Sequence, residues 1–174
     1  MFEKILVALD RSSEATAVFE FALSVAQPQT SQMLLVHFID WEMQEISPWV
    51  GLGTLYDIDV AGERYEWSHQ RLQKEIEQCK SWLESYTQKA SSLEIDCKAE
   101  CQVGNCNIGI VNRAKEWGAD LIVIGRRGHK NISEILLGSV SNYVIHHASC
   151  TVLVVQGTKA SETDEVNRTT EVIS

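Results

Sequence analysis

Two pairs of glycines frame a short basic segment in the second half of the chain. Gly125-Arg126-Arg127-Gly128 is followed, after nine residues, by Gly138-Ser139-Val140-Ser141. Glycine allows a backbone to approach a ligand closely and to turn with a positive φ, which we expect at Gly128. A helix that begins at the second pair would present free amides at its positive end, and such amides bind anions. We therefore predict that the loop Gly125–Ser139 holds phosphate groups; the alternative is a plain turn and helix cap.

The side chains of this loop also suit an anionic ligand. The hydroxyls of Ser139 and Ser141 would add hydrogen-bond donors, and Arg126 and Arg127 concentrate positive charge. This local cluster can oppose the net charge of −9 of the whole chain. The acidic balance itself argues against nonspecific binding of nucleic acid, which needs a basic surface.

A second glycine pair has the spacing of the start of a P-loop but lacks the lysine and the serine or threonine of that motif. Gly104 and Gly109 have the spacing, yet Ile110 and Val111 stand where lysine and serine or threonine belong. We therefore do not predict a phosphate loop here. Because Gly104 and the preceding Val103 end a predicted strand, both remain candidate ligand contacts.

Short apolar strands alternate with amphipathic helices along the chain, which predicts an α/β fold with a parallel sheet. The predicted strands are Lys4–Leu9, Met33–Ile39, Glu94–Val103, Leu121–Ile124 and Thr151–Val155. Four helices are predicted. The first follows a cap at Ser12 or Ser13, the second spans Glu66–Tyr86, the third ends at Gly118, and the fourth begins at Gly138. The stretch Asp40–Tyr65 is acidic, aromatic and rich in glycine, so we expect a long irregular loop there.

Ligands of such sheets gather at the carboxyl ends of the strands, near the point where the strand order reverses. That rule selects Asp10, the end of the second strand at Phe38–Asp40, and the chain from Gly125 onward. Asp10 could equally serve as the cap of the following helix.

The residues quoted so far resemble the universal stress protein family. Its ATP-binding motif, Gly-x2-Gly-x9-Gly-Ser, is matched in full by Gly125, Gly128, Gly138 and Ser139. The resemblance covers residues 1–156 and includes the opening Ile5–Asp10 and the closing Cys150–Val155. It implies an open five-stranded parallel sheet of order 3-2-1-4-5, Rossmann-like, with helices on both faces. Residues 157–174 are polar, and we expect them to form a flexible tail.

The resemblance also implies roles for individual residues. Asp10 would bind the ribose, while Ala8, Leu9, Phe38 and Ile124 would line the adenine pocket. Phe38 is bulkier than the valine common in the family, so the pocket would be tighter or the base would stack on the ring. The full set of candidate nucleotide-binding residues is Ala8, Leu9, Asp10, Phe38, Val103, Gly104, Ile124, Gly125, Arg127, Gly128, Gly138, Ser139, Val140 and Ser141.

Composition limits the remaining possibilities. The apolar runs are too short to cross a membrane, and the chain runs from Met1 straight into a strand, so we expect a cytoplasmic protein. The five cysteines lack a CxxC pair, so thiols are expected rather than disulfides or a zinc site.

Three functions remain open at this point. The first is a nucleotide-responsive module in which ATP or AMP changes the surface shown to an unidentified protein partner. The second is a slow ATP hydrolase or phosphotransferase, for which Asp10 with Mg²⁺ would be the best metal site. The third is a dimerising scaffold whose loop is structural. Whichever holds, the family's strand order makes Thr151–Val155 an edge strand, and we expect a twofold homodimer through it.

Overall fold

The computed structural model describes residues 2–40, 56–126 and 137–156, with only the backbone described for residues 56–68. Five parallel strands form one open sheet of order β3-β2-β1-β4-β5, as the family resemblance implies. The strands are β1 (Lys4–Ala8), β2 (Gln32–Ile39), β3 (Asp96–Val103), β4 (Leu121–Gly125) and β5 (Thr151–Val155). Their bounds differ from the predicted ones by no more than two residues.

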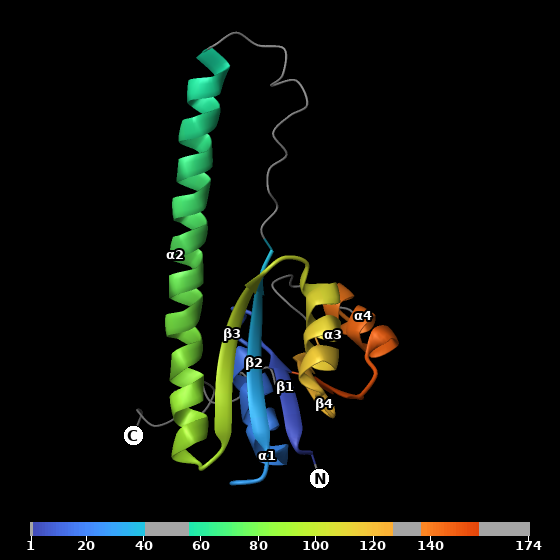
Figure 1. Cartoon of the computed structure of the whole chain (residues 1–174). Helices are drawn as coiled ribbons and strands as arrows, with labels where there is room; N and C mark the ends of the chain where they lie inside the picture. The colour runs from blue at the N-terminus through green and yellow to red at the C-terminus, as the bar shows by residue number, and fades with distance from the viewer. Residues whose placement is uncertain (1, 41–55, 127–136, 157–174) are drawn as a thin grey trace, which may run out of the picture.

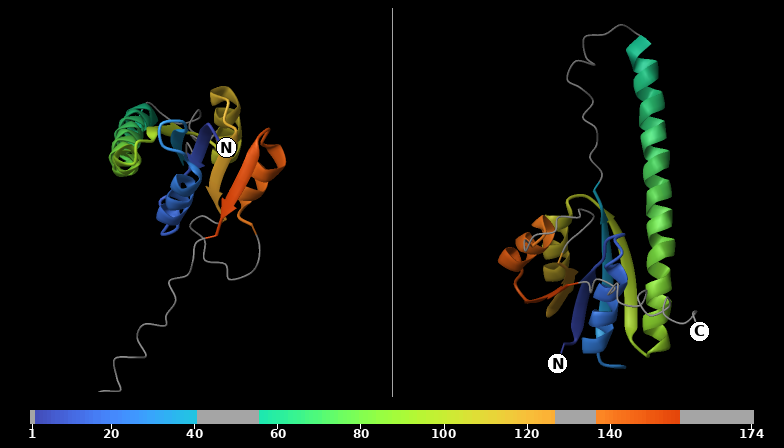
Figure 2. Two further views of the ribbon diagram at one scale, coloured as in Figure 1. Left: turned by 90° about the horizontal axis from the view of Figure 1, so that it is seen from below. Right: turned by 180° about the vertical axis from the view of Figure 1, so that it is seen from behind.

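Helices cover both faces of the sheet. The helices are α1 (Ala15–Val25), α2 (Tyr56–Ser92), α3 (Cys106–Trp117) and α4 (Ser139–His147). Helices α1 and α2 pack on one face, and α3 and α4 pack on the other (Figures 1 and 2). This arrangement explains why the central strands β1 and β4 read as continuous apolar runs, since side chains on both of their faces are buried.

The sheet therefore separates two apolar cores. Alternate residues of β1 point to opposite faces, so Ile5 and Val7 join the core under α1 and α2, while Leu6 and Ala8 join the core under α3 and α4. Cys97 and Cys101 of β3 pack against the first core, on the face shared with Ile95. All five cysteines are free thiols, as expected.

Helix α2 is longer than the sequence pattern predicted. It runs from Tyr56 to Ser92, so the expectation of irregular chain up to residue 65 is wrong for residues 56–65. The 37 residues of α2 span about 55 Å, about twice the length of the eight-residue strands β2 and β3. The helix therefore extends well past the carboxyl ends of the strands (Figure 1). Gly62 was read as a loop residue, but one glycine costs only about 1 kcal/mol inside a helix.

The start of α1 also differs from the prediction. Its N-cap residue is Glu14, which makes no side-chain capping bond, rather than Ser12 or Ser13. The Ser12 hydroxyl still accepts a hydrogen bond from the Glu14 amide at 3.3 Å, but it donates its proton to Asp10. By contrast, α3 ends at Gly118 as predicted, with a φ of 72°, and its first turn is capped by Asn105, which was not predicted.

Candidate nucleotide site

The carboxyl ends of four strands meet at one edge of the sheet, as a parallel sheet requires. Leu9 follows β1 and donates its amide to Val36 of β2 at 3.0 Å. Gly104 follows β3 with a φ of 139° and donates its amide to Ile39 at 3.0 Å. Gly125 ends β4 beside these residues and pairs with Val155. The predicted ligand positions, which lie far apart in the sequence, therefore share one edge of the molecule.

Helix α4 begins at this edge. Gly138 is its N-cap, in an extended conformation, and among the described residues no side chain caps this end. The first bond of the helix joins the Asn142 amide to the Gly138 carbonyl at 2.9 Å. The amides of Ser139, Val140 and Ser141 therefore precede the helical hydrogen-bond ladder, which is the arrangement that binds an anion.

Both ends of the predicted phosphate loop are fixed to each other. The Gly138 amide donates to the Arg126 carbonyl at 2.9 Å, and the Arg126 amide donates to Val155 at 2.8 Å. The residue that follows β4, Arg126, is therefore bonded both to the residue that begins α4, Gly138, and to the end of β5. Arg127 and Gly128, two of the predicted contacts, lie outside the described residues.

The two serines of α4 lie in different surroundings. Ser141 is buried, and its hydroxyl donates to the carbonyls of Arg126 and Gly138, each at 3.0 Å. Its hydroxyl is therefore used to hold the loop ends together, contrary to the expectation that it would face the ligand. Ser139 is exposed, so its hydroxyl remains a candidate phosphate donor.

Asp10 forms a tight turn just after β1. Its Oδ1 atom accepts hydrogen bonds from the Ser12 hydroxyl at 2.5 Å and from the Ser12 amide at 3.2 Å. These bonds orient the carboxylate at the carboxyl edge of the sheet and use one of its two oxygens. The turn explains why Ser12 does not cap α1, and it holds Asp10 at the carboxyl edge of the sheet, at one of the predicted ligand positions.

The candidates for the adenine pocket divide between the two faces of the sheet. Ala8, Ile124 and Phe38 pack with the core under α3 and α4, whereas the Leu9 side chain packs under α1 and α2. Leu9 can therefore reach a ligand on the other face only through its backbone. Its carbonyl oxygen is 2.8 Å from Nδ1 of His37, a contact that no sequence pattern predicts.

Apolar side chains border an open depression beside these strand ends. The depression, of about 330 Å³, is lined by Phe38, Val103, Gly104 and Ile108, among others. Val103 and Ile108 are about half exposed, and both belong to its lining. Ile108 was not predicted; its place at the start of a helix that follows a ligand-side strand could have indicated it.

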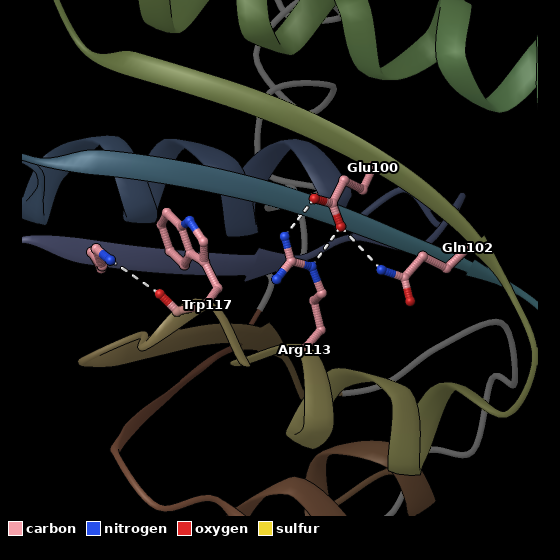
Figure 3. Close-up of polar contacts among 5 residues, drawn as sticks. Glu100, Gln102, Arg113 and Trp117 are labelled. Atoms are coloured by element: carbon pink, nitrogen blue, oxygen red, sulfur yellow. Dashed lines mark hydrogen bonds and ion pairs between the residues drawn. The ribbon is translucent and has the colours of Figure 1, made fainter. Parts of the chain in front are cut away.

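Two polar residues that line the depression, Gln102 and Arg113, are paired with Glu100 (Figure 3). Arg113 of α3 donates two hydrogen bonds to Glu100 of β3, at 2.6 and 2.7 Å, and Gln102 donates a third at 3.0 Å. These bonds from the Arg113 guanidinium lower the pKa of Glu100. The charge of Arg113 is thus engaged by a carboxylate, which makes it a link between α3 and β3 rather than a phosphate ligand.

Metal and thiol chemistry find little support among the described side chains. Within this part of the chain, no three His, Cys, Asp or Glu residues are grouped so that they could hold a metal ion. Cys106 lies near the site, but burial, followed by the negative charge of Asp40, raises the pKa of its thiol. Cys106 is therefore a poor source of thiolate at neutral pH. No described helix is both long enough and apolar enough to span a membrane.

Comparisons with known proteins agree with this geometry. A model of the universal stress protein family matches residues 1–156. The universal stress protein Sll1388 of Synechocystis sp. is 37% identical over 155 residues, which cover 89% of this chain and 98% of that protein.

Solved structures show the same fold. The structure of protein MJ0577 of Methanocaldococcus jannaschii matches with a TM-score of 0.74 and 26% identity, covering 92% of this chain and 99% of that one. A universal stress protein family member from Arabidopsis thaliana, solved with AMP bound, matches with a TM-score of 0.58 and 18% identity, covering 94% and 97%. At this lower identity, the likeness concerns the fold.

Proposed function

Because the chain belongs to the universal stress protein family, we propose that it binds an adenine nucleotide, ATP or AMP, and acts as a nucleotide-responsive module. The observation that carries the proposal is the start of α4, where the amides of Ser139–Ser141 precede the helical ladder and Gly138 is bonded to Arg126 at the carboxyl edge of the sheet. The phosphates would accept hydrogen bonds from the amides of Ser139–Ser141 and from the hydroxyl of Ser139. The Arabidopsis thaliana family member, solved with AMP bound, shows that this fold can hold an adenine nucleotide.

The base has to contribute to the affinity as well as the phosphates. Charge-assisted hydrogen bonds contribute about 1.5–3 kcal/mol each, whereas micromolar binding requires about −8 kcal/mol after association costs. Two or three amide contacts therefore fall short. The half-exposed Val103 and Ile108, with Phe38 beside them, supply apolar surface that a planar base would cover.

Isothermal titration calorimetry with ATP, ADP and AMP, each with and without Mg²⁺, tests the proposal. We expect saturable heat with at least one nucleotide. Gly138→Val should abolish it, because a branched side chain at the N-cap would occupy the space of the phosphates. The matched control is Thr30→Val. Thr30 is exposed and lies just before β2, at the opposite end of the sheet, so this variant should bind nucleotide as the wild type does. Absence of heat with all three nucleotides would refute the proposal.

A steady-state phosphate-release assay separates a responsive module from a hydrolase. A module needs only to hold its nucleotide, so we expect turnover far below the ordinary enzyme range of about 1–1000 s⁻¹. Turnover within that range, lost in the Gly138→Val variant, would assign an ATPase instead.

We further propose that two copies of the chain pair through β5. Within the described sheet, β5 pairs only with β4 and so is an edge. Thr151 donates its amide to Asp120 and Val155 accepts from Arg126, so the backbone groups of Val152 and Val154 point toward the free side. Val154→Pro would remove one outward amide and leave the bonds to β4 intact. Light scattering should give a dimeric mass for the wild type and a monomeric mass for this variant; a monomeric wild type would exclude the pairing.

A further inference from the structure

The first turn of α3 touches the end of β2 without any intervening side chain. A Cβ atom placed on Gly109 would lie 2.1 Å from Cε1 of Phe38 and within 2.8 Å of two further ring atoms. Carbon atoms in ordinary contact are about 3.5–4.0 Å apart. Any side chain at position 109 would therefore displace the aromatic ring by more than about 1 Å.

The backbone on the α3 side of this contact is firmly held. The Gly109 amide donates to the Asn105 carbonyl at 2.9 Å, and the Ile108 amide donates to the Asn105 side chain at 3.2 Å. The helix start is thus fixed twice by Asn105. A clash at Gly109 would be relieved by movement of the Phe38 ring rather than of the helix.

The position of that ring matters because Phe38 borders the depression described above. The ring is only half-buried, and it lines the depression together with Val103 and Ile108. The contact with Gly109 supports the ring from the α3 side. A planar base that enters the depression can then stack on, or pack against, a ring that is already in place.

We propose that Gly109 is a positioning residue of the base pocket: it lets Phe38 lie against the backbone of α3, where the ring forms an aromatic wall for a purine. This inference rests on the proposed nucleotide binding. It gives Gly109 a role unrelated to the P-loop spacing that it imitates. It also accounts for a phenylalanine at this position, because the volume added at residue 38 is matched by volume missing at residue 109.

A double-mutant cycle of Gly109→Ala and Phe38→Val, titrated with ATP, tests the coupling. Loss or displacement of a stacking ring should weaken ATP binding about tenfold in each single variant. In the Phe38→Val background the clash is absent, so Gly109→Ala should have no further effect. Additive losses, or ATP affinity unchanged in both single variants, would overturn the inference.

Inorganic tripolyphosphate is the control ligand, because it has no base and would contact only the start of α4. Its affinity should be equal in all four proteins of the cycle, which a general distortion of the site would not allow. Thermal unfolding should show that the Gly109→Ala variant remains folded. If it does not, the Phe38→Val variant alone tests the inference, and it must bind ATP more weakly than the wild type while binding tripolyphosphate equally well. If the wild type binds tripolyphosphate and ATP equally well, phosphate binding stands and the base pocket fails. If it binds neither, both proposals fail.

Discussion

The two serines in the first turn of α4 should respond in opposite ways to replacement by alanine. Ser141 is 2% exposed and donates to the carbonyls of Arg126 and Gly138, so it holds the loop ends together. Ser139 is exposed in the first turn of the helix and is proposed to donate to a phosphate. We therefore expect Ser141→Ala to lower stability and Ser139→Ala to lower nucleotide affinity.

The size of each effect follows from the contacts. The Ser141 hydroxyl has one proton, which its two carbonyl partners share, so removing it should cost about 0.5–1.5 kcal/mol. The cost stays in this range because the Arg126 carbonyl keeps its bond from the Gly138 amide at 2.9 Å and is not left unpaired. For a chain of this length, 1 kcal/mol corresponds to a fall in Tm of about 2–4 °C.

For Ser139→Ala the expected changes are reversed. An exposed hydroxyl contributes less than about 0.5 kcal/mol to stability. The loss of one charge-assisted hydrogen bond, about 1.5 kcal/mol at the low end of its range, should raise the Kd for ATP about tenfold.

Thermal unfolding without nucleotide and calorimetric titration with ATP should be measured on the wild type, both single variants and the double variant. Because the two hydroxyls act on different quantities, the double variant should show the Tm of Ser141→Ala and the Kd of Ser139→Ala. The reasoning is refuted if Ser139→Ala lowers Tm as much as Ser141→Ala does. It is also refuted if Ser141→Ala weakens ATP binding tenfold without a change in Tm.

Three further predictions concern the described scaffold. Arg113 lowers the pKa of Glu100, so their interaction stabilises the protein at pH values above the ordinary glutamate pKa of 4.5, and this stabilisation is lost as the pH falls through the lowered pKa. Glu100→Gln should therefore lower the free energy of unfolding by up to about 1 kcal/mol at pH 7 and have no effect in stronger acid. Acid and urea titrations of the wild type and the variant would show this. Burial raises the pKa of both Cys79 and Cys97 to about 12. At pH 8, iodoacetamide should therefore alkylate these thiols roughly 1000-fold more slowly in the native protein than in urea. Equal alkylation rates, measured by peptide mass spectrometry, would contradict this prediction. Asn105→Ala removes the side-chain cap of α3 and should lower the free energy of unfolding by about 1 kcal/mol in a urea titration, whereas no change would show that the cap is dispensable.

Several features follow from local sequence rules alone. Continuous apolar runs predict β1 and β4 as strands, and both of their faces are covered by helices in the fold. The end of α3 follows from Gly118, whose preference for the left-handed conformation acts within a few residues. The start of α4 at Gly138 follows from the same kind of rule together with the glycine motif.

The tertiary structure decides contacts between segments that are distant along the chain. No periodicity distinguishes Ser139 from Ser141, because the difference depends on the carbonyl of Arg126, fifteen residues from Ser141. The match between Phe38 and Gly109 likewise depends on the distance between a strand end and a helix start. Local patterns report backbone preference and burial, which neighbouring residues determine. The direction and free space of a single side chain depend on packing across the sheet, so only the folded structure shows them.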